Sequence, residues 1–474
     1  MPQLMKPDLC VIGAGPGGLA AATKAASYGV PVVLVERGPM GGQAWNTGSL
    51  PSKALLASAK RVHEIKNAWA FGVKTDSVNV NQRAISDYAL SAGQALAQNV
   101  SPERLNGLGV EVIRASARFT GPGMVEAGGY QVQARRFIIA TGSSPLVPPI
   151  PGLDRIAYYT CDTIISCLNR ITHLLIMGGN SAALEFAQAY RRLGCDVTVI
   201  EAGTALVRDD PELRAHLLKC LRDEGIRVLE NARIERFETF GSGIQAVFAM
   251  HGKSYSVDGS HVLIAMGRRA NVAGLDLDAG GIVYSDQGIR VTKGLHTSNK
   301  RVYAIGDVTG ETHFAHAAEH HAAAAVKNAL LRLPAQTHHE TMPWVTFTDP
   351  ELAHVGMTEE AARERHGKLT IVRWPYGENL RAHAERQTNG FLKVIASKRG
   401  KILGAGIVGA QAGELIQMWS LAMQKGLSLK DMASIVPPSP TLAEMNKAAA
   451  ENFFVPEAQS SLLRRIVGLL AKLG

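Results

Sequence analysis

The stretch Gly41-Gly42-Gln43-Ala44-Trp45-Asn46-Thr47-Gly48-Ser49-Leu50-Pro51-Ser52-Lys53 decides how the rest of this chain is interpreted. A strand, a glycine turn, a helix and a second strand come before this stretch in the sequence. The first strand is Leu9–Ile12, the turn is Gly13-Ala14-Gly15-Pro16-Gly17-Gly18, and the second strand, Val32–Val35, ends in Glu36. Glycines let the backbone approach a pyrophosphate at the helix amino terminus, and the carboxylate accepts ribose hydroxyls. This pattern predicts a dinucleotide-binding unit with contacts from Gly13, Gly15, Pro16, Gly17, Gly18 and Glu36.

Placed after such a unit, the stretch from Gly41 to Lys53 resembles the redox-disulfide helix of the pyridine nucleotide–disulfide oxidoreductases. This flavoenzyme family includes lipoamide dehydrogenase, glutathione reductase and mercuric reductase. Its pattern is G-G-x-C-x-N-x-G-C-x-P-S-K, and the two cysteines take electrons from FAD. Here Ala44 and Ser49 stand at the cysteine positions. Neither a methyl group nor a hydroxyl undergoes thiol–disulfide exchange. The resemblance implies an FAD-dependent family member that is not a disulfide, lipoamide or mercuric reductase.

The resemblance covers about residues 7–455. It implies an α/β fold with two Rossmann-like dinucleotide-binding domains, for FAD and NAD, and an α+β carboxy-terminal domain that forms a homodimer. The expected boundaries are 1–147 and 281–341 for the FAD-binding domain, 148–280 for the NAD(P)H-binding domain, 342–456 for the interface domain and 457–474 for a basic amphipathic tail.

The resemblance also implies roles for individual residues around the flavin. Lys53 corresponds to a lysine beside the flavin N5, where a positive charge stabilises the electron-rich reduced ring. Glu185 corresponds to the partner of that lysine, so an ion pair is expected. A solvated helix lysine is the alternative, which the Pro51–Leu55 pattern disfavours. The remaining expected FAD contacts are Arg37, Gly42, Ala140, Thr141, Gly142, Gly306, Asp307, Ala315 and His316.

A second dinucleotide unit begins at the strand His173–Met177, and its strand Val197–Ile200 ends in Glu201. In its turn Asn180 replaces the second glycine, placing a side chain where relatives bring backbone to the phosphate. A carboxylate at Glu201 favours the free ribose diol of NADH and repels the 2′-phosphate of NADPH. The small side chain of Ser181 is expected to leave the nicotinamide pocket open. The expected NAD site comprises Gly178, Asn180, Ser181, Glu185, Glu201 and Gly267.

The catalytic base of the family is also missing. Relatives carry an H-P-T-x-x-E pattern whose histidine serves the dithiol, whereas this chain has Ser439-Pro440-Thr441-Leu442-Ala443-Glu444. Serine is no base near neutral pH. Ser439 and Glu444 are therefore the remnant of a His-Glu pair that was lost together with the cysteines.

Composition narrows the remaining classes of protein. The chain has 474 residues, enough for several domains, and its net charge of +9 includes no basic cluster interleaved with aromatics, so nucleic-acid binding is not predicted. Five cysteines do not make a disulfide framework and indicate a reducing compartment. The closest pair, Cys161 and Cys167, is interpreted as ordinary burial in preference to a redox role.

His316 and His320 are one helical turn apart, but no third ligand is in view, so no metal site is predicted. No signal peptide or membrane-spanning run is visible, and a cytoplasmic location is expected.

The tail from Ser460 to Leu473 is a separate unit. Ser460 or Ser461 could cap a helix in which apolar residues recur every three or four positions. Arg464, Arg465 and Lys472 supply its polar side. A helix of this length is too short to cross a bilayer. Two interpretations stay open: it lies in the headgroup layer of an anionic membrane, or it packs on a protein surface.

These observations lead to one preferred function and two alternatives. The preferred function is transfer of electrons from NADH through FAD directly to an acceptor, with a quinone as the leading candidate, as in a diaphorase or quinone reductase. Trp45 could line that acceptor site or merely pack. The alternatives are a pyridine nucleotide transhydrogenase and a flavin protein that transfers electrons to, or binds, a protein partner.

Overall fold

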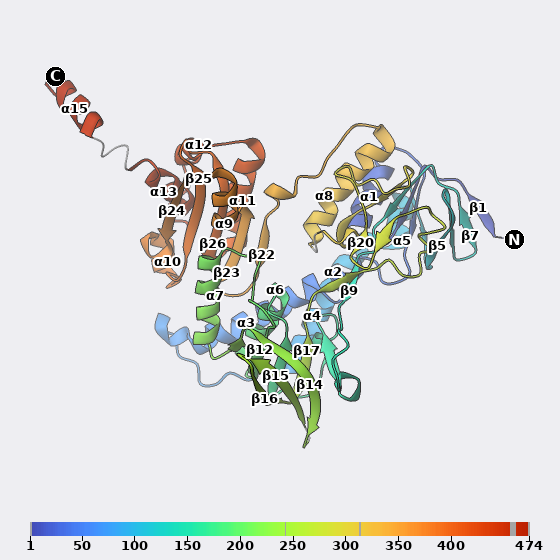
Figure 1. Ribbon diagram of the computed structural model, residues 1–474, viewed down its shortest axis with the longest axis horizontal. Coiled ribbons are helices and arrows are strands. Elements are labelled where there is room, and N and C mark those ends of the chain that lie inside the picture. Colours follow the sequence, from blue (N-terminus) through green and yellow to red (C-terminus); the bar gives the residue numbers. More distant parts are fainter. Residues whose placement is uncertain (1, 242, 312–313, 456–460, 473–474) are drawn as a thin grey trace. The chain divides into compact units, whose positions relative to one another are not determined.

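A computed structural model describes residues 2–241, 243–311, 314–455 and 461–472. The chain forms two compact units, Met1–Gly203 with Leu229–Thr337, and Thr204–Val228 with His338–Gly474 (Figure 1). The expected architecture, two dinucleotide-binding domains and an α+β domain, is confirmed.

The first nucleotide domain is built on a parallel sheet with the strand order β21-β8-β2-β3-β4. Its helices α1 and α8 pack on one face together with Leu9 and Val11. The other face, with Cys10 and Ile12, packs on a small sheet of β1, β7, β6 and β5. All four residues of β2 are buried because both faces are covered. The elements are β1 (Gln3–Met5), β2 (Leu9–Ile12), α1 (Pro16–Ala26), β3 (Val32–Val35), β4 (Val110–Ile113), β5 (Ala117–Gly121), β6 (Met124–Ala127), β7 (Tyr130–Val132), β8 (Arg136–Ile139), β21 (Val302–Ala304) and α8 (Ala315–Val326).

The second nucleotide domain repeats this construction. Its parallel strands follow the order β10-β17-β11-β12, and α6 packs on β11 and β12. An antiparallel sheet of β14, β15 and β16 supplies the apolar cover of the other face. The elements are β10 (Tyr158–Thr160), β11 (His173–Met177), α6 (Ser181–Arg192), β12 (Asp196–Ile200), β14 (Ala232–Phe240), β15 (Gly243–Met250), β16 (Lys253–Gly259) and β17 (His261–Ile264).

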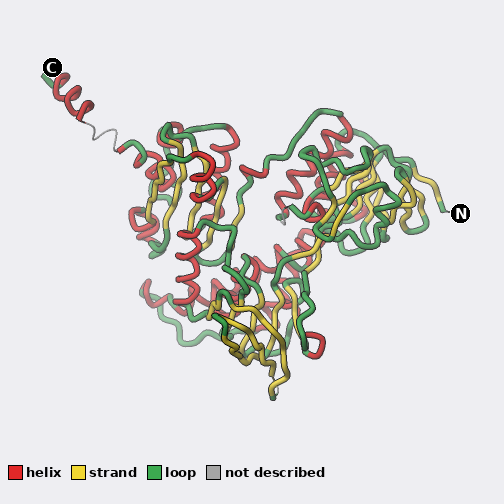
Figure 2. Tube along the Cα trace, in the orientation of Figure 1, coloured by secondary structure: helices red, strands yellow, loops and turns green. Residues whose placement is uncertain are grey.

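A two-stranded antiparallel ribbon of β9 (Ser143–Pro145) and β18 (Arg268–Ala270) lies where the chain passes between these domains. Three helices complete the first domain: α3 (Ser49–Lys66), α4 (Gln82–Ala97) and α5 (Pro102–Gly107). Figure 2 shows this division of helices and strands along the chain.

The second unit contains an antiparallel sheet with the order β22-β23-β26-β25-β24. Trp419 at the centre of its core is fully buried, and its indole Nε1 donates to Asn446 Oδ1 at 2.8 Å. The elements are β22 (Trp344–Thr346), β23 (Glu351–Gly356), α9 (Glu359–His366), β24 (Leu369–Pro375), α10 (Leu380–Ala384), β25 (Phe391–Ser397), β26 (Ile402–Gly409), α11 (Ala412–Lys425), α12 (Leu429–Ala433), α13 (Glu444–Asn452) and α15 (Ser461–Leu470). Ser460, expected as a helix cap, lies outside the described residues. Among the described helices, none is long and apolar enough to cross a membrane.

One segment lies in a different unit from the one predicted. Residues 204–228, with α7 (Pro211–Asp223), were expected in the NAD(P)H-binding domain but form part of the second unit. Lys393, only 4% exposed, lies 2.9 Å from the fully buried Asp210 and also contacts Glu359 at 2.8 Å. The Trp344 indole donates to Asp209 at 2.8 Å. Removing one partner from a buried ion pair costs about 3–5 kcal/mol, so these contacts hold the segment in this unit.

His354 and Asp209, two buried titrating groups of the second unit, have opposite effects on stability as the pH falls. Burial lowers the pKa of His354 from 6.5 to about 4, while burial raises the pKa of Asp209 from 3.8 to about 6. As the pH falls from 6.5 to 4, the unfolded chain takes up a proton at His354 that the folded chain does not, so stability falls. At Asp209 the folded chain binds the proton more tightly, so stability rises over the same window.

Asp209→Asn removes only the second effect, because an amide oxygen can still accept from Trp344. We expect the free energy of unfolding of the variant to fall by about 2 kcal/mol more than that of the wild type between pH 6.5 and 4. Urea titrations followed by tryptophan fluorescence measure this difference. Parallel pH curves for the two proteins would contradict it.

Candidate flavin and nicotinamide site

A cavity of about 610 Å³ lies within the first unit and is lined by both nucleotide domains. It collects most of the residues that the sequence singled out. Those that line it are Gly13, Gly15, Pro16, Gly17, Glu36, Arg37, Gly42, Ala44, Ser49, Lys53, Ala140, Thr141, Gly142, Asn180, Glu185, Gly267, Gly306, Asp307 and Ala315. Those that do not are Gly18, Trp45, Gly178, Ser181, Glu201, His316, Ser439 and Glu444.

The glycines of the first turn serve different purposes. A Cβ on Gly13 would lie 2.4 Å from the Ala140 carbonyl oxygen, and one on Gly18 would lie 1.8 Å from that of Gly13. Both positions therefore need glycine for close backbone packing. Gly15 has an ordinary φ of −72° and no neighbour within 4 Å of an added Cβ. Its glycine keeps space open in the cavity at the amino terminus of α1, where a pyrophosphate is expected.

The two strand-end carboxylates are held in the same way. The Glu36 oxygens accept from the backbone N–H groups of Ala14 and Gly38, each at 2.6 Å. The Glu201 oxygens accept from Gly179 at 2.6 Å and from Gly203 at 2.8 Å. Each carboxylate is thus fixed beside the glycine turn of its own domain, which is the arrangement that ribose recognition requires.

The ion pair expected from the sequence is present. Lys53 Nζ lies 2.7 Å from Glu185 Oε2, with Lys53 from α3 and Glu185 from α6. Glu185 is 5% exposed and Lys53 35% exposed, so the carboxylate is buried while the ammonium group borders the cavity. The pair joins the two nucleotide domains at one end of the cavity.

The segment that carried the family's cysteines keeps its shape without them. The short helix α2 (Gly42–Asn46) precedes α3, and Asn46 Nδ2 donates to the carbonyls of Met40 at 3.0 Å and Gly42 at 2.7 Å. Trp45, a candidate for lining the acceptor site, packs against the core of the first domain and covers Gly41 instead. Of the two interpretations left open for Trp45, the packing one agrees with this position, because residue 45 follows residue 44 on a helix and faces another direction.

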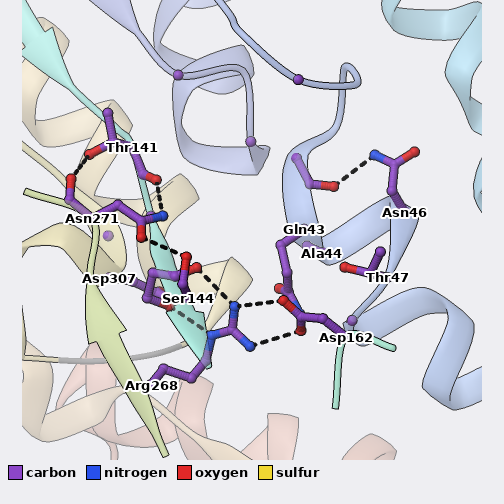
Figure 3. A pocket seen from close by; sticks show the side chains of 18 of the residues that line it. Gln43, Ala44, Asn46, Thr47, Thr141, Ser144, Asp162, Arg268, Asn271 and Asp307 are labelled. Atoms are coloured by element: carbon purple, nitrogen blue, oxygen red, sulfur yellow. Dashed lines mark hydrogen bonds and ion pairs between the residues drawn. The ribbon is translucent and has the colours of Figure 1, made fainter. Parts of the chain in front are cut away.

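A chain of polar contacts that no sequence motif indicated lies beside the segment of the lost cysteines (Figure 3). Gln43 Nε2 donates to Asp162 at 3.0 Å, and Arg268 Nη1 donates to the same carboxylate at 3.0 Å. The Arg268 Nε donates to Ser143 Oγ at 2.8 Å, and that hydroxyl donates to Asp307 at 2.6 Å. The network therefore connects α2 with the β9–β18 ribbon and with the expected flavin contact Asp307.

The Asn180 side chain is committed to the protein. Its Oδ1 accepts from the Ala183 N–H at 3.1 Å and caps α6, while its Nδ2 donates to the Ala265 carbonyl at 2.7 Å. Asn180 therefore caps the helix that carries Glu185. The sequence had indicated only that its side chain stands where relatives bring the backbone close to the phosphate.

Cys161 also borders the cavity, which the sequence did not indicate. Burial raises the pKa of its thiol to about 12, so it is protonated near neutral pH. Cys167 is buried, as expected. The aromatic ring of His316 stacks on Phe314 with centroids 5.3 Å apart, and among the described residues no group of three potential ligands suits a metal ion.

The remnants of the His-Glu pair lie in the second unit. Glu444 Oε2 accepts from the Thr441 N–H at 2.8 Å, one turn before its own helix. Ser439 is exposed. Glu444 thus has a local structural contact in place of an imidazole partner.

Comparisons with known proteins agree with this geometry. Residues 7–322 match the model of the pyridine nucleotide-disulphide oxidoreductase family, and residues 342–450 match the dimerisation domain of the same family. The chain belongs to the pyridine nucleotide–disulfide oxidoreductases, which are FAD-dependent flavoproteins that use NAD(P)H. The dimerisation domain supports a homodimer.

Individual relatives span nearly the whole chain. A mercuric reductase of Streptomyces lividans is 35% identical over 94% of this chain and 96% of its own length. A dihydrolipoyl dehydrogenase of Geobacillus stearothermophilus is 32% identical over 94% and 95%. Among solved structures, LpdA of Mycobacterium tuberculosis gives a TM-score of 0.87 at 25% identity, covering 94% of this chain and 99% of LpdA. RclA of Escherichia coli, an HOCl-induced flavoprotein disulfide reductase, gives 0.84 at 26% identity with the same coverage.

Proposed function

We propose that this protein is an FAD-dependent oxidoreductase that passes electrons from NADH directly to a quinone, without a dithiol. The observation that carries this proposal is the cavity in which the Lys53–Glu185 pair is kept while Ala44 and Ser49 replace both cysteines. FAD, when bound, supplies a two-electron carrier between the nicotinamide and the acceptor.

The residues present fit FAD. The open space at Gly15 and the backbone N–H groups of α1 suit the pyrophosphate, and Glu36 suits the adenosine ribose. Asp307 and Ser143 suit the ribityl end of the cofactor. Lys53 would hold positive charge beside the isoalloxazine, where it favours the reduced form.

NADH is the proposed nucleotide. Glu201 is fixed by two backbone N–H groups and would accept hydrogen bonds from both ribose hydroxyls. A 2′-phosphate would bring two negative charges against this carboxylate. This preference also argues against a transhydrogenase, since that reaction needs both nucleotides.

The substitutions at positions 44, 49 and 439 favour direct transfer to the acceptor. Without sulfur at Ala44 and Ser49, neither a disulfide nor a thiol-bound metal can be reduced at this position. Without an imidazole at Ser439, no base serves a dithiol. Disulfide, lipoamide and mercuric reduction are therefore not proposed, although these are the activities named for relatives.

The test is anaerobic mixing of the holoenzyme with NADH, and separately with NADPH, followed by a water-soluble quinone. We expect fast loss of flavin absorbance with NADH, reduction at least about tenfold slower with NADPH, and fast return of absorbance on adding the quinone. Loss without return would contradict quinone transfer and favour the NADP⁺ or protein-partner alternatives. No loss with either nucleotide would contradict the oxidoreductase proposal.

We also propose that this enzyme works as a homodimer at the cytoplasmic face of a membrane, where a lipid-soluble quinone is concentrated. The surface that would make the contact is the tail helix.

A further inference from the structure

The tail helix α15 exposes its apolar side chains. Side chains are described from Arg464 to Lys472, and all of these residues are exposed. Ile466 is 46% exposed, Val467 58%, Leu469 66% and Leu470 58%. Four large apolar residues within five positions of one described helix make an apolar surface that the described part of the chain does not cover, and such surfaces usually mark contact sites.

The polar residues of the helix fall on the opposite side. At about 100° per residue, Ile466, Leu469 and Leu470 share one side, with Val467 at its border. Arg465, Gly468 and Lys472 share the other, with Arg464 at its edge. The helix is thus divided lengthwise into an apolar and a cationic half.

The charge of the segment has one sign. Glu457 is the last acidic residue in the sequence, and Arg464, Arg465 and Lys472 follow it. Helices that pack on proteins commonly carry both signs on their polar side, which pair at three- and four-residue spacing. A helix with cations alone beside an apolar half is suited to an anionic lipid surface, where phosphates meet the cations and acyl chains meet the apolar half.

We propose that α15 lies in the headgroup layer of an anionic membrane, parallel to its plane. Its ten residues span about 15 Å, so the helix rests in the layer without crossing it. This contact deepens the proposed function and rests on it for its purpose, since it would hold the enzyme where lipid-soluble quinone is dissolved. The lipid binding itself does not depend on quinone turnover.

The test uses the full-length holoenzyme and sedimentation with vesicles of phosphatidylcholine, with or without phosphatidylglycerol. We expect binding to the anionic vesicles to be at least about 25-fold tighter than to the neutral ones and to weaken with added salt. Arg464→Gln with Arg465→Gln should weaken it about 25-fold, since each basic residue contributes about fivefold at such a surface. Ile466→Ser with Leu470→Ser should weaken it at least about tenfold.

The matched control is Lys398→Gln with Arg399→Gln, another adjacent and exposed basic pair in the same unit. It makes the same change in net charge and should leave vesicle binding unchanged. The proposal would be overturned by equal binding to both kinds of vesicle or by no binding to anionic vesicles at low salt. It would also be overturned if the control variant lost as much binding as Arg464→Gln with Arg465→Gln. So would a change of oligomeric state in the tail variants without lipid, because the helix would then cover a protein surface. Turnover of a water-soluble quinone without vesicles, measured in parallel, tests the proposed function separately.

Discussion

Replacing Lys53 with methionine is expected to slow reduction of the flavin by NADH about 100-fold, the usual loss when a preorganised charge that stabilises the product of electron transfer is removed. Methionine keeps the length of the side chain but carries no charge. Lys53 is the cation that Glu185 holds at 2.7 Å at the edge of the cavity. Stopped-flow mixing with NADH, on protein whose FAD content has been checked, measures this rate.

Two further variants test whether the positive charge at position 53 sets the rate of flavin reduction. Lys53→Arg retains the positive charge and should recover much of the rate. Lys66→Met removes an exposed lysine from the same helix, whose Nζ donates to the Arg192 carbonyl at the carboxy end of α6 at 3.3 Å, and should leave the rate unchanged. If Lys53→Met reduced its flavin as fast as the wild type, the cation would not lie beside the flavin ring.

Replacing Gly15 with alanine is expected to weaken FAD binding about 100-fold while the protein still folds. An added Cβ would touch no protein atom within 4 Å, so the change introduces no internal clash, and the φ of −72° suits alanine. The methyl group would instead occupy the space assigned to the pyrophosphate. Loss of two charge-assisted hydrogen bonds, at the lower value of about 1.5 kcal/mol each, accounts for the expected magnitude.

The matched control for this variant is Gly107→Ala. Gly107 ends α5, has no neighbour within 4 Å of an added Cβ and does not line the cavity. Both variants should unfold at temperatures close to that of wild-type apoprotein, and only Gly15→Ala should be purified without flavin. If Gly15→Ala bound FAD with wild-type affinity, the pyrophosphate would not bind at this turn.

The sequence predicted those parts of the site that are built from local motifs. The glycine turns, the strand-end carboxylates Glu36 and Glu201 and the ends of the Lys53–Glu185 pair all lie in short patterns with a fixed physical purpose. The partners of that pair are 132 residues apart, yet each could be recognised separately. The fold class followed from the same motifs, because each strand–turn–helix–strand pattern defines one parallel sheet.

Contacts between segments without motifs could not be predicted in this way. Gln43 and Asp162 are 119 residues apart, and neither residue lies in a sequence motif that predicts its hydrogen-bond partner. Arg268 follows a recognised turn at Gly267, but its bonds to Asp162 and Ser143 depend on the pairing of β18 with β9 and on the turn after β10. The two interpretations of Trp45 stayed open for a related reason, since its position in the sequence beside Ala44 says nothing about which way a single helical turn faces.

The discontinuous second unit has a consequence for how the chain folds during synthesis. Asp210 is made 183 residues before Lys393, the cation that neutralises it in the buried cluster. At about 5–20 residues per second, roughly 10–40 s pass between the two on the ribosome. Throughout that interval α7 does not have both β23 and β26 to pack against, so its apolar side stays open to water or to chaperones. The carboxy-terminal unit therefore assembles late, around a helix that was released early.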